Sequence, residues 1–429
     1  MFNANYKIQI EEKIKEAKTF IIVGFFLSLS LFLTVVPAKA DVVTEWNEIA
    51  ETVIVSNAKR PAGAALVDMA CVHAAIYDAV NAIDGRYSVY SVQIPNAPTE
   101  ASKEAAAMTA AYHVLKKLFP AQQEYLETKY QESLSKVSEG KSKTDGISIG
   151  ETVANRFTKS RAHDNRDANV PYIPKIKQGS GWQPTFPTYA APLTPWLARM
   201  RPFMIESPWQ FRPLGPPSLS SQKWAKDFNE TKAFGDLNSK VRTPEQTEIG
   251  LFYTEHAGSQ LSRIFRDFAA TQKISLVDNA RLFAMLYLSV ADSLIAAWDS
   301  KYHFNYWRPV TAIRNADSDG NRLTETNSEW VPLAPTPDHP EYPAAHGSIT
   351  AAYVEVLRHF FKTKNINIAL TSSVTGTSRK FRNTDDLIRE IINARVYGGM
   401  HYRKSGEDGV LIGKKVAHWM AEHYFQPVR

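Results

Sequence analysis

The chain has 429 residues, of which 44% are hydrophobic and 22% are charged. This length and composition suit a globular protein with one large core or two medium cores, and they exclude a largely disordered chain. The net charge is +6. Lysine and arginine form no long run, so the sequence gives little support to nucleic-acid binding. The single cysteine, Cys71, excludes disulfides within the chain and zinc sites built from four cysteines.

The first 40 residues have the pattern of an export signal. A lysine-containing start is followed by an apolar run from Phe20 to Val36 and by the small-x-small cleavage sequence Ala38-Lys-Ala40. The apolar run is shorter than the roughly 20 residues that a membrane-spanning helix needs. We therefore predict a cleaved signal peptide over residues 1–40, no stable membrane span after cleavage, and a secreted or periplasmic protein.

Most of the remaining chain has the apolar spacing of helices. The first four predicted helices can form a four-helix bundle, and they span residues 64–83, 99–118 with Thr99 as a plausible cap, 120–137 and 145–160. A stretch rich in proline, glycine and tryptophan follows over residues 162–219. Because loops of this length are usually functional or connect domains, we predict an N-terminal helical region over 41–219 and a C-terminal helical domain over 220–429.

The C-terminal region contains six further predicted helices, over residues 221–233, 243–260, 276–307, 345–361, 384–397 and 406–424. The sequence shows no sustained alternation of the kind that predicts strands and no internal repeat. The predicted fold class is therefore all-α, with two helical bundles.

Two cations stand out near the end of the predicted helix 276–307. Lys301 and Arg308 are seven residues apart, so a continuous helix would present both from one face. Trp298 would share that face, and Pro309 would end the helix. Two cations beside an aromatic ring suit an anion site. A solvated basic face, or ion pairs with acids on the same helix, would explain the same pattern.

His346 follows Pro343-Ala-Ala and precedes an apolar pattern of helical spacing, which places it near a helix N-terminus. Free backbone N–H groups there bind anions, and the local field lowers the pKa of a histidine. A neutral imidazole in this position suits a general base. A histidine with only a capping role is the alternative.

Arg395 and His401 are six residues apart, and on one helix they would diverge by about 120°. Gly398-Gly399 between them predicts that the helix stops there, which lets the chain bring His401 back. Arginine gives a fork-like grip on tetrahedral oxyanions. An ordinary salt bridge and a core histidine would be the simpler explanation.

Together, these three segments resemble the signature of the vanadium-dependent haloperoxidase and type 2 phosphatidic-acid phosphatase superfamily. The resemblance is strongest between about Leu276 and Val416. The stretches over residues 298–309 and, more weakly, 74–84 resemble the secreted bacterial haloperoxidase branch. The resemblance implies a helical fold whose C-terminal bundle holds the oxyanion site.

The resemblance also implies a role for each residue. Lys301, Arg308 and Arg395 would bind the equatorial oxygens of vanadate, or of phosphate in the same site. His401 would bond to the metal, or attack phosphorus in a phosphatase. His346 would be the acid–base group at the apical oxygen. The implied reactants are hydrogen peroxide, a halide and a small organic acceptor, with vanadium acting as a Lewis acid.

The chain departs from the family pattern at four positions. Ala344 and Ala394 replace serines, and Ala345 replaces a glycine whose backbone N–H binds the oxyanion; the Ala345 N–H can still donate. Ser405 replaces an aspartate that orients the nucleophilic histidine of the phosphatases. This last loss weakens the phosphatase interpretation more than the peroxidase one, unless Asp408 substitutes.

Two further residues bear on the halide. Trp298 matches a halide-pocket tryptophan, and His339 stands where chloroperoxidases have phenylalanine and algal bromoperoxidases have histidine. This favours bromide over chloride. The sequence thus predicts a vanadate-dependent haloperoxidase that produces hypohalous acid. The alternatives are an acid-phosphatase-like hydrolase of phosphate esters, with His401 as nucleophile, and a degenerate scaffold that only binds an oxyanion.

Overall fold

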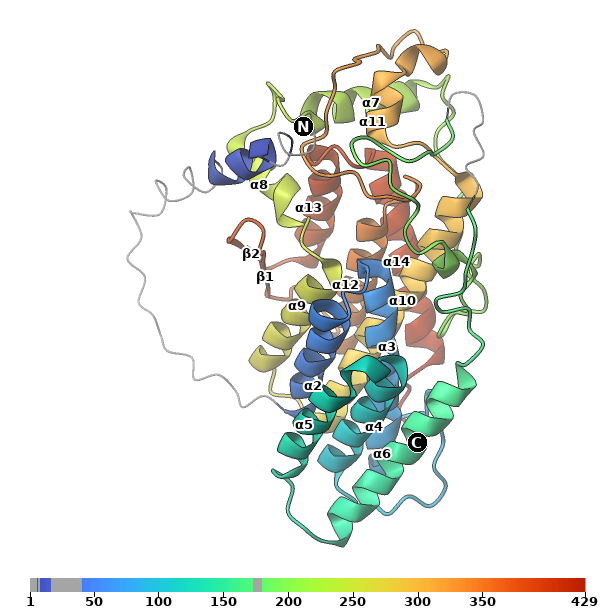
Figure 1. The fold of residues 1–429 in the computed structure, drawn as a ribbon, viewed down its shortest axis with the longest axis vertical. Coiled ribbons are helices and arrows are strands. Elements are labelled where there is room, and N and C mark those ends of the chain that lie inside the picture. The colour runs from blue at the N-terminus through green and yellow to red at the C-terminus, as the bar shows by residue number, and fades with distance from the viewer. Residues whose placement is uncertain (1–5, 7, 17–40, 173–179, 429) are drawn as a thin grey trace, which may run out of the picture.

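The structure is a computed structural model that describes residues 6, 8–16, 41–172 and 180–428. The all-α prediction is confirmed: packed helices make up most of the described chain (Figure 1). Residues 8–16 are helical, whereas the apolar run and the cleavage sequence of the predicted signal peptide lie outside the described residues. The signal peptide therefore stays a prediction.

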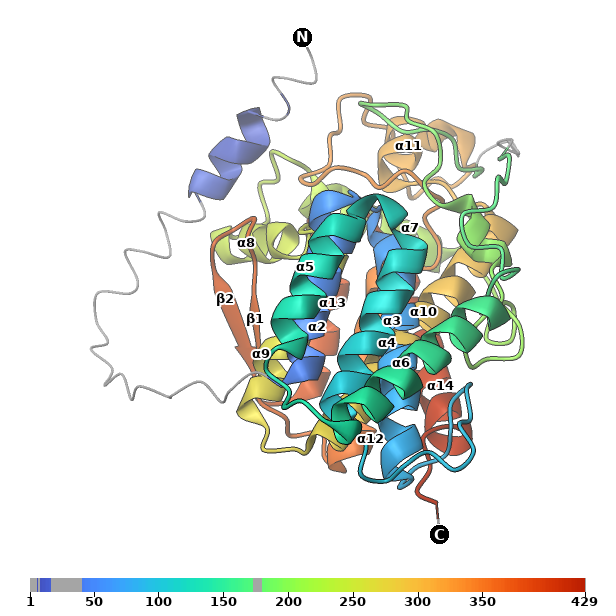
Figure 2. The ribbon, with the colours of Figure 1, turned by 60° about the horizontal axis from the view of Figure 1, so that its bottom comes forward.

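The N-terminal helices pack side by side in the lower half of Figure 1 and in front in Figure 2. Helix α4 begins later than predicted because Ser102, and not Thr99, caps it: the Ser102 hydroxyl accepts a hydrogen bond from the Ala105 N–H at 3.1 Å. Helix α2 was not predicted. The helices are α2 (Val42–Glu51), α3 (Ala62–Asp84), α4 (Lys103–Leu118), α5 (Gln123–Leu134) and α6 (Lys141–Ser160), with short helical turns at Thr52–Asn57 and Pro120–Gln122.

The remaining elements follow from residue 195 onward. They are η3 (Pro195–Arg199), α7 (Gln222–Gly235), α8 (Pro244–Phe252), α9 (Ala257–Thr271), α10 (Leu276–Phe304), α11 (Pro309–Arg314), η4 (Ala316–Ser318), α12 (Ala345–Phe361), β1 (Ile368–Thr371), β2 (Ser378–Phe381), α13 (Thr384–Tyr397) and α14 (Arg403–His423). Helices α12 and α13 match the predicted bounds. The helix predicted over 243–260 is divided into α8 and α9, and the hairpin β1–β2 is an addition to the predicted elements.

One prediction about helix geometry is wrong. Helix α10 ends at Phe304 because Asn305 adopts a left-handed conformation, with φ 51°. Arg308 is the N-cap of α11, and Pro309 begins that helix instead of ending α10. Lys301 and Arg308 therefore do not share one helical face. A break in the chain turns Arg308 back toward Lys301.

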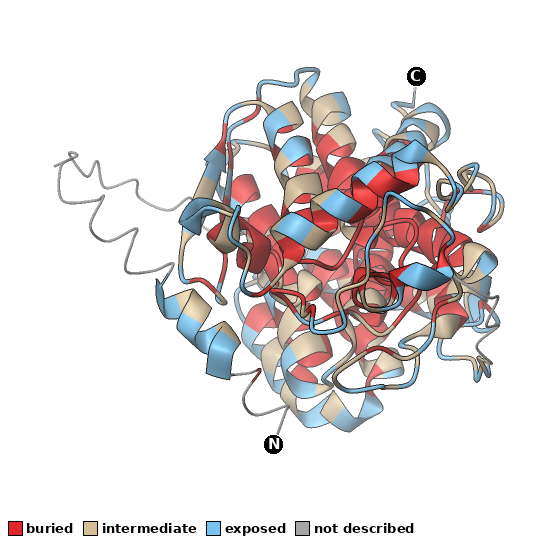
Figure 3. Cartoon of the chain, turned by 90° about the horizontal axis from the view of Figure 1, so that it is seen from above, coloured by how far each residue is buried: buried red, intermediate tan, exposed pale blue. Residues whose placement is uncertain are grey.

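Helices α3 and α10 are long and apolar enough to cross a membrane, but 94% of each apolar window is buried inside the protein, as in core helices of globular proteins. They pack against each other, and the largest hydrophobic core contains side chains from residue 42 to residue 425. Figure 3 shows these buried residues gathered in the central helices. The predicted domain boundary at residue 219 stays a prediction, although this core contains residues from both sides of it.

The contact between α12 and α14 positions the two predicted catalytic histidines. A Cβ atom added at Gly409 would collide with the Ala344 carbonyl, and one at Gly413 would collide with the Ser348 carbonyl. The two helix backbones therefore touch where only glycine fits. His346 lies in the first turn of α12, and His401 lies just before α14. The crossing thus fixes where these two segments stand relative to each other.

A buried histidine makes the stability of this fold depend on pH. His73 Nε2 lies 2.9 Å from Asn47 Nδ2, and its ring stacks on Tyr287 with 4.7 Å between centroids. Burial lowers the pKa of His73 to about 3. The unfolded chain binds this proton below a pKa of about 6.5, so the contribution of His73 is fully present above that pH and is lost as pH falls toward 3.

We expect His73→Gln to reduce the difference in unfolding free energy between pH 7 and pH 5 by about 2 kcal/mol. Urea denaturation at the two pH values measures this difference. The exposed His418 provides the matched control, and His418→Gln should leave the pH difference as it is in the wild type. An unchanged pH difference in His73→Gln would contradict the prediction.

Candidate active site

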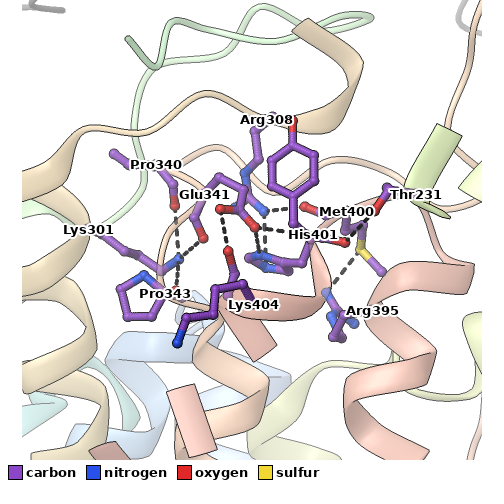
Figure 4. A network of polar contacts seen from close by, with 12 residues as sticks. Thr231, Lys301, Arg308, Pro340, Glu341, Pro343, Arg395, Met400, His401 and Lys404 are labelled. Carbon is purple, nitrogen blue, oxygen red and sulfur yellow. Dashed lines mark hydrogen bonds and ion pairs between the residues drawn. The ribbon is translucent and has the colours of Figure 1, made fainter. Parts of the chain in front are cut away.

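The five charged or ionisable residues singled out in the sequence converge on one region of the C-terminal half. Lys301 lies in the last turn of α10, Arg308 caps α11, His346 lies in the first turn of α12, Arg395 lies in the last turn of α13, and His401 lies in the loop before α14. Figure 4 shows four of them, with Glu341, in one network of polar contacts. Lys301, Arg308, Arg395 and His401 are almost completely buried.

Arg308 lies at the centre of this network. Its Nη1 donates to the Met400 carbonyl at 2.9 Å and to His401 Nε2 at 3.1 Å. Its Nε donates to the His339 carbonyl at 2.9 Å, and its Nη2 lies 3.0 Å from His339 Nδ1. One guanidinium thus connects the His401 loop with the loop that precedes α12.

Lys301 holds the same loop from the other side. Its ammonium group donates to the carbonyls of Pro340, Glu341 and Pro343 at 2.9, 2.9 and 2.6 Å. Three carbonyl acceptors match the three hydrogens of the ammonium group. The ammonium also lies 5.8 Å from the ring centroid of Trp298, so the predicted side-by-side placement of these two residues is present.

The Tyr253 backbone joins Arg395 to His346. The Tyr253 carbonyl accepts from Arg395 Nη1 at 3.1 Å, and the His346 ring hydrogen-bonds the same backbone. Among the described residues, the buried Nε of Arg395 has no hydrogen-bond partner. Arg395 therefore keeps one donor available for a ligand.

The turn that carries His401 depends on two glycines, as the sequence predicted. Helix α13 ends at Tyr397, and Gly399 adopts a left-handed conformation with φ 71°. A Cβ atom there would collide with the Gly235 carbonyl. The His401 N–H then returns to the Arg395 carbonyl at 3.3 Å, which brings both side chains into the site.

Glu341 is a functional candidate that the sequence motifs did not identify. Its Oε1 lies 2.9 Å from His401 Nδ1 and accepts from the Tyr402 N–H at 3.1 Å, and its Oε2 accepts from the Ser405 hydroxyl at 2.7 Å. The only sequence signal was an acidic residue five positions before His346. Its partners are 60 or more residues away in the chain, so spacing alone did not reveal them.

The positions that depart from the family pattern now have structural neighbours. Ser405 contacts the Glu341 carboxylate. Asp408, considered as a substitute for the missing aspartate, instead accepts hydrogen bonds from Tyr342 and Lys404. Ala345 is the first residue of α12 and lines the pocket. The N–H of a first helical residue lacks a partner within its helix, so this group remains available to an anion.

The electrostatics of the site favour an anion. Three buried cations lie near one fully buried carboxylate, Glu341, and the partly buried Asp338 also acts on Arg308, so positive formal charge is in excess. Burial lowers the pKa of Lys301 well below its usual value, and the neighbouring Arg308 lowers it further. Burial also lowers the pKa of Arg308 to about 10 and that of Arg395 to about 9. A bound oxyanion would oppose all three shifts.

The histidines of the site are neutral. Burial and the nearby Arg395 lower the pKa of His346 well below its usual value, and burial and Arg308 do the same for His401. Burial raises the pKa of Glu341 to about 7, although the nearby Arg308 and Lys301 oppose this shift. The site therefore holds uncharged imidazoles beside fixed cations, which suits proton transfer and bonding to an electrophilic centre.

A cavity of about 410 Å³ adjoins the site; Arg395, His346 and His401 line it, whereas Lys301 and Arg308 lie behind its wall. The predicted site residues Trp298, His339, Ala345, His346, Arg395 and His401 all contribute to its wall. The ring centroids of Trp298 and His339 are 4.7 Å apart. The rest of the wall is mostly apolar, with side chains that include Pro61, Leu66, Leu193, Leu294 and Ile349. Reactive groups thus lie beside a chamber that suits a hydrophobic molecule.

A helical fold with buried cations and histidines gathered beside one cavity is also what the comparisons find. Residues 281–429 match the family model described as the VCPO second helical-bundle domain. The chain is also 26% identical over 189 residues to the vanadium chloroperoxidase of Curvularia inaequalis. That match covers 35% of this chain and 30% of the relative, so the chain spans about a third of the curated relative's length.

Solved structures show the same fold over most of the chain. A bacterial vanadium-dependent iodoperoxidase superposes with a TM-score of 0.75 at 22% identity, covering 90% of this chain and 98% of that one. A holo-type bacterial vanadium-dependent chloroperoxidase gives a TM-score of 0.70 at 19% identity, covering 89% and 97%. The resemblance to the vanadium-dependent haloperoxidases that the three sequence segments predicted is thereby confirmed.

Proposed function

We propose that the protein is a vanadate-dependent haloperoxidase, which oxidises a halide with hydrogen peroxide to hypohalous acid. The observation that carries the proposal is the burial of three cations against one fully buried carboxylate around His401. Burying an unpaired charge costs several kcal/mol, so a site of this composition is built to be completed by an anion. The similarity to haloperoxidases makes vanadate the favoured anion.

The residues present fit vanadate. Lys301, Arg308 and Arg395 would supply the positive charge around it, with the free Arg395 Nε and the Ala345 N–H as donors. Lys301 would have to exchange a loop carbonyl for a vanadate oxygen. His401 would bond to vanadate through Nε2, the ring nitrogen opposite the Glu341 contact, in place of its present contact with Arg308. Bound vanadate supplies Lewis-acid activation of hydrogen peroxide. Phosphate has the same shape and would compete for this site.

The protein itself would supply proton transfer and exclude water. His346 is neutral, adjoins the cavity and hydrogen-bonds the Tyr253 backbone through its ring, which orients it. In this state it can take a proton from hydrogen peroxide as the peroxide enters, and can return it to the departing oxygen. The buried positive charges would already surround the site before the anion binds, which is the general advantage of a preorganised charged site.

The halide would bind beside Trp298 and His339. The Trp298 Nε1 is buried and has no hydrogen-bond partner among the described residues. His339 Nδ1 lies 3.0 Å from Arg308 Nη2, which can only donate, and 3.2 Å from the Pro340 carbonyl, which can only accept. The shorter Arg308 contact favours the tautomer with its proton on Nε2. Two N–H donors in the cavity wall suit a halide ion, and the histidine supports the preference for bromide inferred from the sequence.

The apolar part of the cavity is suited to the small organic acceptor. Its proline and leucine side chains line the same cavity as His346 and His401, so an acceptor bound there would meet the oxidised halogen before that species diffuses away. The signal pattern of residues 1–40 leads us to propose a secreted or periplasmic location as well. In that location the protein would take peroxide and halide from outside the cytoplasm.

Replacing His339 with phenylalanine is expected to lower the preference for bromide. The substitution removes the acceptor for Arg308 Nη2 and one N–H donor of the cavity. We expect the ratio of kcat/KM for bromide to that for chloride to fall by about tenfold, as measured in a bromination and chlorination assay with vanadate-loaded protein. His113→Phe, a matched change in α4 outside the cavity, should keep the ratio. If both variants had the same ratio of kcat/KM for bromide to that for chloride, His339 would have no role in selecting the halide.

A phosphatase is the second candidate, and Glu341 is the observation that favours it. The missing aspartate had weakened this interpretation, yet Glu341 supplies a carboxylate at His401 Nδ1. A carboxylate-paired imidazole can act as a nucleophile toward a phosphate ester. The same cations would hold the ester's phosphate group.

One pair of assays separates the candidates. Vanadate-loaded protein should brominate a phenolic dye with hydrogen peroxide, and phosphate should inhibit. A phosphatase would instead hydrolyse a chromogenic phosphate ester, and vanadate would inhibit it. Absence of bromination by vanadate-loaded protein contradicts the haloperoxidase proposal. A scaffold that only binds the oxyanion would show neither activity while retaining phosphate binding.

A further inference from the structure

We propose that Glu341 is the positioning residue of His401. Its carboxylate holds the Nδ1–H of the imidazole, so the lone pair lies on Nε2, where it now accepts from Arg308 and would bond to the central atom once an oxyanion replaces that contact. The role rests on the proposed use of His401 as the histidine that bonds to this atom. It assigns the orienting function to a residue outside the three sequence segments.

Two contacts select the same tautomer of His401. Arg308 has donors and no acceptor, so its 3.1 Å contact with Nε2 requires Nε2 to accept. The proton of the neutral ring must then be on Nδ1, and it points to Glu341 Oε1 at 2.9 Å. Each partner excludes the other tautomer, because an Nε2–H would face a guanidinium and a bare Nδ1 would face a carboxylate.

Glu341 is itself held firmly. Its side chain is fully buried, and both carboxylate oxygens are engaged, with the Tyr402 N–H and the Ser405 hydroxyl as the additional donors. Its backbone N–H donates to the Tyr306 carbonyl at 2.9 Å. A group with this many fixed partners can set the angle of the imidazole plane, as the outer partners of metal-bound histidines do.

The arrangement also accounts for Ser405. An aspartate at 405 would place a second carboxylate against Glu341, and the two charges would repel in a buried site. A serine instead donates to Glu341 at 2.7 Å. The carboxylate has thus moved from the start of α14 to the loop before α12, and Ser405 now supports it.

The test uses two variants and two readouts. Nitrogen-15 NMR of histidine-labelled protein reports the His401 tautomer without any ligand. Binding of vanadate and of orthophosphate is measured separately by equilibrium dialysis. In Glu341→Ala we expect loss of the Nδ1–H tautomer preference and about 10- to 100-fold weaker vanadate binding. Phosphate binding should change far less, because phosphate forms no bond to Nε2.

Glu341→Gln is the conservative variant. Its amide oxygen can accept from Nδ1–H, and its amide nitrogen can donate to the Ser405 hydroxyl, so tautomer and vanadate affinity should stay close to wild type. If Glu341 served only to balance charge, both variants would bind vanadate and phosphate more tightly, which would overturn the proposal. An unchanged His401 tautomer in Glu341→Ala would overturn it as well.

Two further variants serve as a stability control and as a test of rescue. Glu248→Gln changes an equally buried, arginine-paired glutamate near the hairpin and controls for general loss of stability in thermal unfolding. Glu341→Ala/Ser405→Asp returns a carboxylate to the start of α14 and should restore the tautomer. Because the NMR readout needs no halide oxidation, this proposal can fail while the haloperoxidase proposal holds, and the reverse is also possible.

Discussion

Arg308→Ala is expected to abolish vanadate binding and halide oxidation. The guanidinium contacts the Met400 and His339 carbonyls, His339 Nδ1 and His401 Nε2. Its removal leaves these acceptors without a donor and takes one of three charges from the site. We expect vanadate affinity to fall by about 1,000-fold or more, which corresponds to roughly 4 kcal/mol. Equilibrium dialysis with vanadate measures the loss directly.

Arg308→Lys separates charge from geometry. Lysine retains the positive charge but lacks the planar fork that reaches the carbonyls and both imidazoles at once, so it should recover only a small part of the affinity. Arg389→Ala changes an exposed arginine on α13 and should bind vanadate like the wild type. Near-wild-type vanadate affinity in Arg308→Ala would contradict the proposal that this residue binds the oxyanion.

His346→Gln is expected to lower kcat by about 10²- to 10⁴-fold, the range typical of a lost general acid–base group. Vanadate affinity should change by only a few-fold, because the three cations and His401 remain in place. A large loss of kcat with little loss of vanadate affinity distinguishes an acid–base residue from a residue that binds the vanadate. Steady-state bromination kinetics on vanadate-saturated protein provide the measurement.

His359→Gln is the matched control, since His359 lies in the last turn of the same helix, α12, and outside the cavity wall. Its kcat should equal that of the wild type. If His346→Gln instead lost vanadate affinity in proportion to activity, His346 would be part of the anion-binding group and the proton transfer would belong to another residue.

The sequence was most informative where local chemistry determines structure. The bounds of α12 and α13 were predicted correctly because their apolar spacing and capping signals are local, and Gly398-Gly399 correctly indicated the turn that brings back His401. Lys301 and Arg308 were expected together for the wrong reason. Helical periodicity placed them on one face, whereas the left-handed Asn305 ends the helix between them.

The role of Glu341 was beyond such reasoning. A glutamate between two prolines carries no periodic signal, and its contacts with His401 and Ser405 exist only after α10, α12 and α14 have packed. The same applies to the carbonyl acceptors of Lys301. Every residue has a backbone carbonyl, so residue types do not show which carbonyls accept hydrogen bonds. The sequence therefore reveals the cations of such a site more readily than the backbone groups that hold them.

The backbone contact between α12 and α14 has a consequence for how this protein could change over evolution. No side chain fits between the two helices at Gly409 and Gly413. The distance between the two histidine-bearing segments therefore cannot be adjusted by changing a side chain at this contact. Repacking of side chains elsewhere would hardly alter that spacing. Diversification should therefore be concentrated in the cavity wall, where substitutions would change which molecules bind while the arrangement of the two histidine-bearing segments is inherited intact.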